Sequence, residues 1–263
     1  MNNNDKQYII NNLTSSNLHE RPFPYTVIDN FLPENLAQSL SNEFPDYDDD
    51  VWFNYNNKIE HKKLLSDWRK FPSSTYQVFS FFNSQWMLNT LSNLADSPLI
   101  EDQGLHGGGW HIHSNGGKLN PHLDYSLHPT LHLQRKLNLI VYLSEDWKES
   151  YGGHFGLWDQ HPTEMRAHNL VKEIGIKFNR AVLFDTTKQS WHGLSRKVKC
   201  PKGIYRKSLA TYYLINPPAN TSTRSRALFS PTKEQLNDPN ISELIAKRSD
   251  LNASKETYEE KNN

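Results

Sequence analysis

The chain has 263 residues, which suits one large domain, because all-β barrels and sandwiches often reach this length. Its 29 basic and 29 acidic side chains give a formal net charge of +0, so we expect no general nucleic-acid-binding surface. The sequence contains no run of about 18 apolar residues, so no membrane span is expected. The single cysteine, Cys200, excludes an internal disulfide and a zinc site built on several thiolates.

A cytoplasmic location is expected from the same features. The polar N-terminal stretch "MNNNDKQYIINNLTSS" lacks the basic-then-apolar pattern of a secretory signal. One cysteine fits a reducing compartment. The 7 Trp, 12 Tyr and 12 Phe need a packed interior, which indicates a folded globular protein.

The chain is predicted to begin with a flexible lead over residues 1–22, followed by one folded domain over 23–218. Within that domain, "PFPYTVIDNFL" (22–32) predicts a short strand. Residues 33–45 predict a helix, because large apolar side chains recur at every fourth position: Leu36, Leu40 and Phe44.

Helical support for the domain is expected over residues 33–97. Residues 46–63 carry many acids and asparagines and are predicted to form a polar loop. Residues 73–96 predict a second helix with a broad apolar side, formed by Tyr76, Phe79, Trp86, Leu88 and Leu91.

The character of the sequence changes after residue 104. Short β-branched or aromatic runs such as "KLNLIVYLSED", "RAVLFDTT" and "RKSLATYYLINPP" are separated by Gly, Asn, Asp or Pro. Many short strands with turns between them predict a β-sandwich or barrel. The fold class is therefore mainly β with flanking helices, and the helices are expected to cover one face of the sheet.

A polar C-terminal tail is predicted over residues 219–263. It is predicted to contain one short helix in "NDPNISELIAKRSD", with Asp238 as N-cap and Pro239 as the first helical residue. The last dozen residues, "NASKETYEEKNN", have a composition typical of disorder.

A candidate metal site begins with "NPHLDYS" (120–126). In an extended segment His122 and Asp124 point to the same side and can reach one ion. The best third ligand is His192 in "DTTKQSWHGLS", near the end of a predicted strand. Two histidines and one carboxylate form the facial triad of non-haem Fe(II) oxygenases, which leaves coordination positions for a chelating cosubstrate and O₂.

The usual cosubstrate of such a centre is 2-oxoglutarate, whose distal carboxylate needs a buried cation. Arg206 in "IYRKSLATYYL" begins the next predicted strand after His192. Its planar guanidinium can bind a carboxylate through two parallel hydrogen bonds.

Four segments, in this order, resemble the 2-oxoglutarate/Fe(II)-dependent dioxygenase superfamily in its prolyl-4-hydroxylase-like branch. They are "GGKLNPHLDYS", "RKLNLIVYLSEDWKESYGGHFGLWD", "FNRAVLFDTTKQSWHGL" and "YRKSLATYYL". The stretch "PFPYTVIDNFLPENL" is similar to the start of these domains, so the resemblance covers most of residues 22–216.

The resemblance implies a double-stranded β-helix, or jelly-roll, with its core over residues 104–216. It implies His122, Asp124 and His192 as Fe(II) ligands, and it implies a 2-oxoglutarate site formed by Arg206, Tyr142, Asn138 and Ser208. The implied cofactor and cosubstrates are Fe(II), 2-oxoglutarate and O₂, and ascorbate is allowed as a reductant. The longer link over residues 195–204, "SRKVKCPKGI", departs from the pattern and is expected to form a loop near the entrance, with Cys200 exposed.

A substrate pocket is predicted from His111, His113, Tyr125 and Trp158, since these residues lie on or beside the strands that carry the triad. An alternative is a zinc site at His106, His111 and His113, but no nearby carboxylate or thiolate completes it.

The predicted activity is hydroxylation of a C–H bond of a prolyl residue or another peptide or amino-acid substrate, with release of succinate and CO₂. The same chemistry on a saccharide or small metabolite stays open, and so does the oligomeric state. A non-catalytic jelly-roll binding module is the alternative from another class, which loss of a ligand or of Arg206 would favour. An iron halogenase is disfavoured by Asp124, because halogenases have a small residue there.

Overall fold

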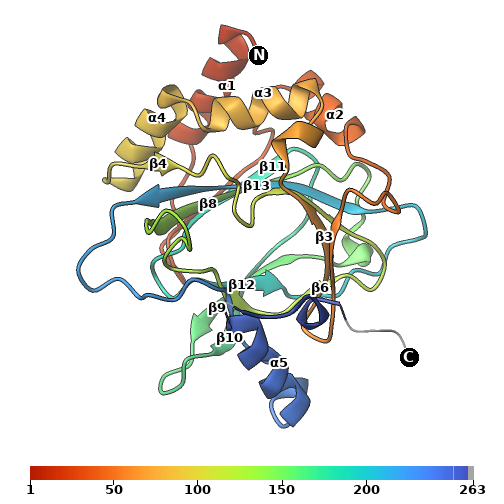
Figure 1. The fold of residues 1–263 in the computed structure, drawn as a ribbon. Coiled ribbons are helices and arrows are strands. Elements are labelled where there is room, and N and C mark those ends of the chain that lie inside the picture. Colours follow the sequence, from red (N-terminus) through yellow and green to blue (C-terminus); the bar gives the residue numbers. More distant parts are fainter. Residues whose placement is uncertain (251, 260–263) are drawn as a thin grey trace.

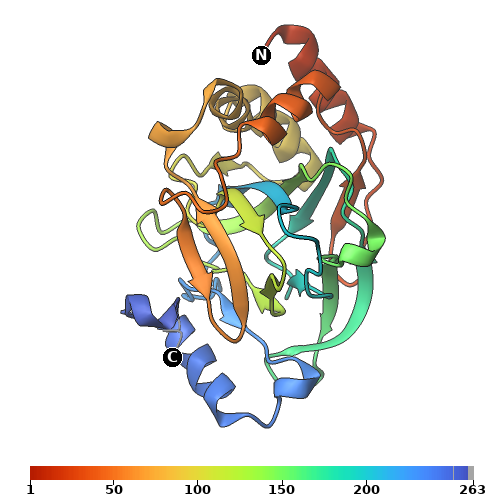
Figure 2. The ribbon, with the colours of Figure 1, turned by 90° about the vertical axis from the view of Figure 1, so that its right-hand side faces the viewer.

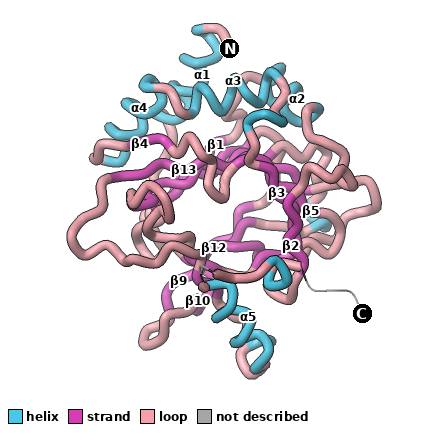
Figure 3. Tube along the Cα trace, viewed as in Figure 1, coloured by secondary structure: helices cyan, strands magenta, loops and turns pink. Residues whose placement is uncertain are grey.

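The computed structural model describes residues 1–250 and 252–259. Two antiparallel sheets face each other and form most of the fold (Figures 1 and 3). The larger sheet has nine strands. Its main path runs in the order β1 (Tyr25–Ile28), β11 (Arg180–Asp185), β8 (Gln134–Tyr142), β13 (Arg206–Ile215), β5 (Gly109–His113), β3 (Glu60–Leu65) and β2 (Phe53–Asn56), with β4 (Ile100–Glu101) on β13 and β6 (Lys118–Leu119) on β3.

The smaller sheet has five strands, in the order β10 (Ala167–Ile174), β9 (Phe155–Gln160), β12 (Trp191–Leu194), β7 (His122–Leu123) and β14 (Leu228–Phe229). Apolar side chains from both sheets, including Tyr142, Leu157 and Phe184, form a core between them. The predicted fold class, mainly β with a jelly-roll core and flanking helices, is therefore confirmed.

Four helices cover the outer face of the larger sheet, at the top of Figure 1: α1 (Asn3–Thr14), α2 (Glu34–Asn42), α3 (Ser73–Phe82) and α4 (Gln85–Ala95). Helix α5 (Pro239–Ser249) lies at the opposite end of the molecule, which Figure 2 shows from the side. Short 3-10 turns occupy Trp68–Lys70, Glu149–Tyr151, Lys233–Gln235 and Lys255–Thr257. None of these helices is long and apolar enough to cross a membrane.

The predicted flexible lead over residues 1–22 is wrong for its first part. Residues 3–14 form α1, which starts with a capping box at Asn2 and Asp5. Its Ile9, Ile10 and Leu13 are buried in the main core. The prediction failed because a mostly polar composition hid one narrow apolar stripe.

Two predictions in the helical region need correction. The expected polar loop over residues 46–63 contains β2 and most of β3, which form a hairpin. The expected single helix over 73–96 is two helices, because Ser84 caps a new one, and Tyr76 and Trp86 of the predicted apolar side are partly exposed.

The C-terminal tail packs more than its composition suggests. Helix α5 has Asp238 as N-cap and proline at its first position, as predicted. The disorder predicted for the last dozen residues is wrong for 252–259, where the Asn56 amide donates to the Tyr258 carbonyl at 2.7 Å. Residues 260–263 lie outside the described part of the chain.

Candidate active site

The two histidines predicted as metal ligands are direct partners on neighbouring strands. His122 begins β7, His192 lies in β12, and the pairing register places them opposite each other. Gly193 permits this approach, because a Cβ there would lie 2.7 Å from the carbonyl oxygens of Leu119 and Asn120. The glycine of "WHG" therefore lets the strand that carries His192 pack against the β6–β7 segment.

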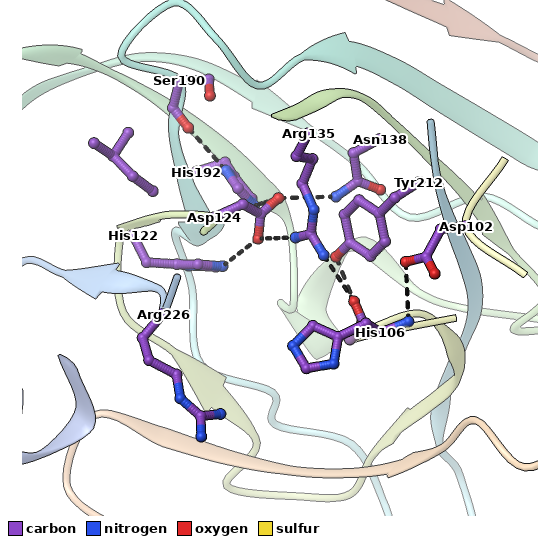
Figure 4. A network of polar contacts seen from close by, with 12 residues as sticks. Asp102, His106, His122, Asp124, Arg135, Asn138, Ser190, His192, Tyr212 and Arg226 are labelled. Carbon is purple, nitrogen blue, oxygen red and sulfur yellow. Dashed lines mark hydrogen bonds and ion pairs between the residues drawn. The ribbon is translucent and has the colours of Figure 1, made fainter. Parts of the chain in front are cut away.

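Asp124 follows β7 and completes a buried cluster between the sheets (Figure 4). His122 Nε2 lies 3.8 Å from Asp124 Oδ1, and His192 Nε2 lies 3.7 Å from Asp124 Oδ2. One ligand atom of each residue lies within 4.8 Å of the others, so the three can hold one metal ion. The structure thus brings together the three residues that the sequence singled out.

Backbone carbonyls orient both imidazoles. His122 Nδ1 lies 3.1 Å from the Asn120 oxygen, and His192 Nδ1 lies 2.8 Å from the Ser190 oxygen. These contacts place the proton on Nδ1 and leave the Nε2 lone pair for a metal. Burial lowers the pKa of both histidines, and that of His122 is lowered well below its usual value. Both rings are therefore neutral at neutral pH, which is the metal-binding form.

Asp124 has an ion-pair partner at one oxygen and a hydrogen-bond donor at the other. Arg135 Nη1 lies 3.1 Å from Oδ1, and Asn138 Nδ2 donates to Oδ2 at 3.3 Å (Figure 4). Burial raises the pKa of this carboxyl, but Arg135, the two histidines and the Asn138 hydrogen bond together outweigh this effect, so the pKa lies below its usual range. The carboxylate therefore stays charged. Asn138, predicted to line the 2-oxoglutarate site, contacts the Asp124 carboxylate.

Arg135 contacts the triad, a position that the sequence did not predict. Its guanidinium carbon lies 3.4 Å from the ring centroid of Tyr125 and 3.3 Å from that of Tyr212. Strand alternation alone places Arg135 and Asn138 on opposite faces of β8. The β8–β13 register shifts by one residue at Lys136, and this bulge brings Arg135 to the inner face.

Arg206 lies on β13 of the larger sheet and is buried. Its Nε donates to the Gly153 carbonyl at 2.8 Å, and its guanidinium carbon lies 4.9 Å from the ring centroid of Tyr142. Ser208, next on the same face, pairs in register with Tyr142. The buried Tyr142 hydroxyl has no hydrogen-bond partner among the described residues. This group of donors suits a carboxylate ligand.

His111 and His113 lie beside this group on β5, opposite Ser208 and Arg206 respectively. Within the described chain, neither ring nitrogen of His113 has a hydrogen-bond partner, nor does His111 Nε2. Burial lowers the pKa of both rings well below the usual value. The two histidines therefore lie next to the predicted carboxylate anchor, and they do not line the cavity that contains His122.

The predicted pocket residues Tyr125 and Trp158 lie in different places. Tyr125 lines the same cavity as His122 and Asp124. The prediction for Trp158 is wrong: Leu157 is the register partner of His192, so Trp158 points to the outer face of the smaller sheet. There it packs with a cluster around Trp191.

The link between His192 and Arg206 is not a free loop. Val198 and Cys200 are buried, and the Cys200 thiol donates to the Ile204 carbonyl at 3.0 Å. The expectation of an exposed Cys200 is therefore wrong. The Val198 amide donates to the Gly117 carbonyl, which ties the link to the turn before β6.

A cavity of ≈ 360 Å³ opens beside the triad. Besides His122 and Asp124, it is lined by side chains from β2, β3, β8, β13 and the C-terminal segment, among them Tyr55, Glu60, Lys62, Arg135, Tyr212, Arg226, Phe229, Arg248 and Tyr258. Lys62 lay in the predicted loop and Arg248 in the predicted tail, so neither was recognised as a candidate. The alternation of "IEHKKLL" after the "NN" turn was the available signal for Lys62.

Residues 108–214 match the family model described as the 2OG-Fe(II) oxygenase superfamily. No curated protein matches the sequence.

Solved structures of similar fold include a Pseudomonas putida prolyl-4-hydroxylase, with 16% identity, 81% of this chain and 100% of that chain covered, and a TM-score of 0.53. A prolyl 4-hydroxylase from Phytophthora capsici has 20% identity, coverage of 95% and 77%, and a TM-score of 0.55. A prolyl hydroxylase from Trichoplax adhaerens, in complex with a hypoxia inducible factor peptide fragment, has 18% identity, coverage of 80% and 88%, and a TM-score of 0.51. At these identities the likeness is one of fold.

Proposed function

We propose that the chain is a 2-oxoglutarate/Fe(II)-dependent hydroxylase with His122, Asp124 and His192 as its Fe(II) ligands, because residues 108–214 match the model of that oxygenase superfamily and contain this cluster. The observation that carries this proposal is the buried cluster itself. Its two imidazoles are held with Nε2 inward, and its carboxylate is kept charged. This mixed set of nitrogen and oxygen donors suits Fe(II).

Arg206 is the proposed anchor for the distal carboxylate of 2-oxoglutarate. Its buried guanidinium and the Tyr142 hydroxyl, which has no partner among the described residues, are donors that lack a carboxylate acceptor. Without such a ligand, a buried cation costs several kcal/mol of folding free energy. The residues present therefore fit the cosubstrate.

When bound, Fe(II) and 2-oxoglutarate would let O₂ oxidise both organic molecules: one oxygen atom would convert 2-oxoglutarate to succinate and CO₂, and the other would be inserted into a substrate C–H bond. The chain supplies orientation and exclusion of water. Arg135 and Asn138 fix the two oxygens of Asp124, so the carboxylate cannot rotate away from the ligand position. The stacked tyrosines 125 and 212 hold Arg135 in place.

The proposed substrate is a prolyl residue or another peptide or amino-acid substrate. Support comes from the folds of the three prolyl hydroxylases above, one of which holds a peptide fragment. A saccharide or small metabolite is the alternative substrate class.

The test is succinate formation by Fe(II)-loaded protein with prolyl peptides, free amino acids and saccharides as separate substrates. We expect one class to stimulate succinate release above the substrate-free rate, and Asp124→Ala to abolish it. Lack of 2-oxoglutarate turnover in wild-type protein that binds Fe(II) would contradict the proposal.

A further inference from the structure

The cavity beside the triad carries an excess of positive charge. Its basic side chains are Lys62, Arg135, Arg226 and Arg248, and its acidic side chains are Glu60 and Asp124. Both acids already have a cation: Arg135 lies 3.1 Å from Asp124, and Arg248 Nε lies 2.6 Å from Glu60. An additional cation in this space therefore has no carboxylate of its own in the cavity.

Lys62 is such a cation. Its Nζ lies 5.1 Å from the ring centroid of Tyr55 and makes no hydrogen bond or ion pair with any residue that the structure describes. Its neighbour Lys63 points to the other side of β3, where its Nζ donates to the Tyr47 carbonyl. Burial lowers the pKa of Lys62, and nearby Glu60 opposes this effect. An ammonium group in such a place calls for an anionic ligand.

Lys62 is separate from the proposed 2-oxoglutarate anchor. The registers put Leu64 opposite His111 and Arg206 opposite His113, so β5 lies between the strands of Lys62 and Arg206. Two strand spacings separate their backbones by roughly 10 Å. Arg206 does not line the cavity that Lys62 lines. Lys62, and not Arg206, is therefore the cation that faces the space beside the triad.

The C-terminal segment forms one wall of this cavity. Arg248 of α5 has its guanidinium carbon 4.5 Å from the Tyr258 ring centroid and 5.2 Å from that of Phe229. The ring of Tyr258 in turn lies 5.6 Å from that of Tyr55. A volume of ≈ 360 Å³ is at the low end of the range for small-molecule sites. The space suits a small molecule better than the middle of a peptide.

We propose that the substrate of this enzyme is a small molecule whose anionic group, a carboxylate or a phosphate, binds to Lys62 beside the triad. The proposal rests on the proposed function and narrows its substrate class to free amino or imino acids and similarly small carboxylates or phosphates. Arg226 lines the same cavity.

The test measures anion binding near the metal without turnover. Wild-type protein is loaded with Mn(II) and saturated with 2-oxoglutarate, which occupies Arg206. Acetate and inorganic phosphate are then titrated separately, and the paramagnetic relaxation of their ¹³C and ³¹P nuclei reports binding close to the metal. Enhancement by acetate alone identifies a carboxylate site, and enhancement by phosphate alone identifies a phosphate site.

Three variants separate charge from structure. Lys62→Met should weaken anion binding about tenfold or more, because a charged hydrogen bond is lost. Lys62→Arg should retain it. Lys58→Met is the matched control, since this exposed lysine lies in the turn of the same hairpin, and it should bind the anions like wild type. If Lys62→Met does not fold, Lys62→Gln replaces it.

Equal anion binding in wild type and Lys62→Met overturns the inference, and so does loss of 2-oxoglutarate affinity in Lys62→Met, because the lysine would then belong to the cosubstrate site. Turnover distinguishes this failure from failure of the proposed function. Protein that binds the anions at Lys62 but never forms succinate contradicts only the function. A neutral, doubly blocked prolyl peptide that wild type and Lys62→Met hydroxylate equally well contradicts only the inference.

Discussion

The two sheets position their functional residues in different ways. In the smaller sheet, His122 and His192 lie on strands of only 2 and 4 residues, and carbonyls two residues earlier orient both rings. In the larger sheet, Tyr142 and Arg206 lie on strands of 9 and 10 residues. The half of the site that is proposed to bind metal thus depends on short local motifs, whereas the half that is proposed to bind the cosubstrate depends on the register of a long strand pair.

This difference predicts that the two halves can be damaged separately. The largest effect is expected from His122→Ala or Asp124→Ala, because each removes a metal ligand from a buried three-residue cluster. Mutating a residue that only orients a metal ligand lowers metal affinity by up to about 100-fold. Removing a ligand should therefore lower the affinity by more than this, and turnover should be lost. Mn(II) binding by electron paramagnetic resonance measures the affinity, and Asp159→Ala, an acid on β9 outside the cluster, is the control. Full activity of Asp124→Ala would refute the metal assignment.

Gly193→Ala should damage the same half without removing a ligand. Its Cβ would lie 2.7 Å from two backbone oxygens, so β12 must move away from the β6–β7 segment. Overpacking of this kind costs about 1–3 kcal/mol of unfolding free energy. We expect weaker metal binding and a lower melting temperature, while 2-oxoglutarate still protects the protein. Gly203→Ala is the comparison variant. A Cβ added at Gly203 meets no atom within 4 Å, but φ is positive there, so this variant measures the cost of backbone strain alone.

Arg206→Lys tests the cosubstrate half. Lysine keeps the charge but loses the two-pronged geometry. We expect 2-oxoglutarate affinity to fall by roughly 10–100-fold, about 1.4–2.8 kcal/mol, in anaerobic titrations of metal-loaded protein. Metal binding should be unchanged, since Arg206 lies on the other sheet from the ligands. Unchanged 2-oxoglutarate affinity in both Arg206→Lys and Arg206→Ala would place the anchor elsewhere.

Sequence patterns predicted the residues of the smaller sheet well because their spacing is local. The H-x-D motif places both side chains on one side of an extended strand by alternation alone. The glycine of "WHG" only has to let β12 pack closely against the β6–β7 segment. The segment order also predicted the fold class and placed Arg206 on the strand after His192.

The residues that were missed depend on information that a single sequence does not display. Arg135 reaches Asp124 only because a bulge at Lys136 reverses the alternation of β8. Arg248 reaches Glu60 across 188 positions of sequence, through the docking of α5. Trp158 was placed on the wrong face because its register against β12 was unknown.

Acid should destabilise the metal-free protein through both halves. Burial lowers the pKa of His111, His113, His122 and His192 below 6.5, the ordinary value. The unfolded chain then binds more protons than the folded one below pH 6.5, so stability is lost as pH falls. Each such histidine contributes a slope of about 1.4 kcal/mol per pH unit until its folded pKa is reached.

Chemical unfolding at a series of pH values measures this slope. His113→Gln removes one titrating ring from the larger sheet. The pH dependence of the unfolding free energy should then be smaller by the contribution of one proton, roughly 1.4 kcal/mol per pH unit. A slope identical to that of wild type would mean that His113 is charged in the folded protein.

The smallest effect is expected on the outer face of the smaller sheet, where Trp158 lies. Its ring packs in the cluster around Trp191, on the side of β9 opposite His192. Trp158→Leu should cost about 1 kcal/mol of unfolding free energy, because the side chain is only half-buried, and kcat and KM should not change. The matched change is Tyr125→Leu, which removes a ring that stacks on Arg135 within the cavity. That variant should lose coupled hydroxylation while it still binds metal. A fall in turnover for Trp158→Leu with intact metal affinity would extend the substrate path to the outer face, and the division between the two faces of this sheet would be wrong.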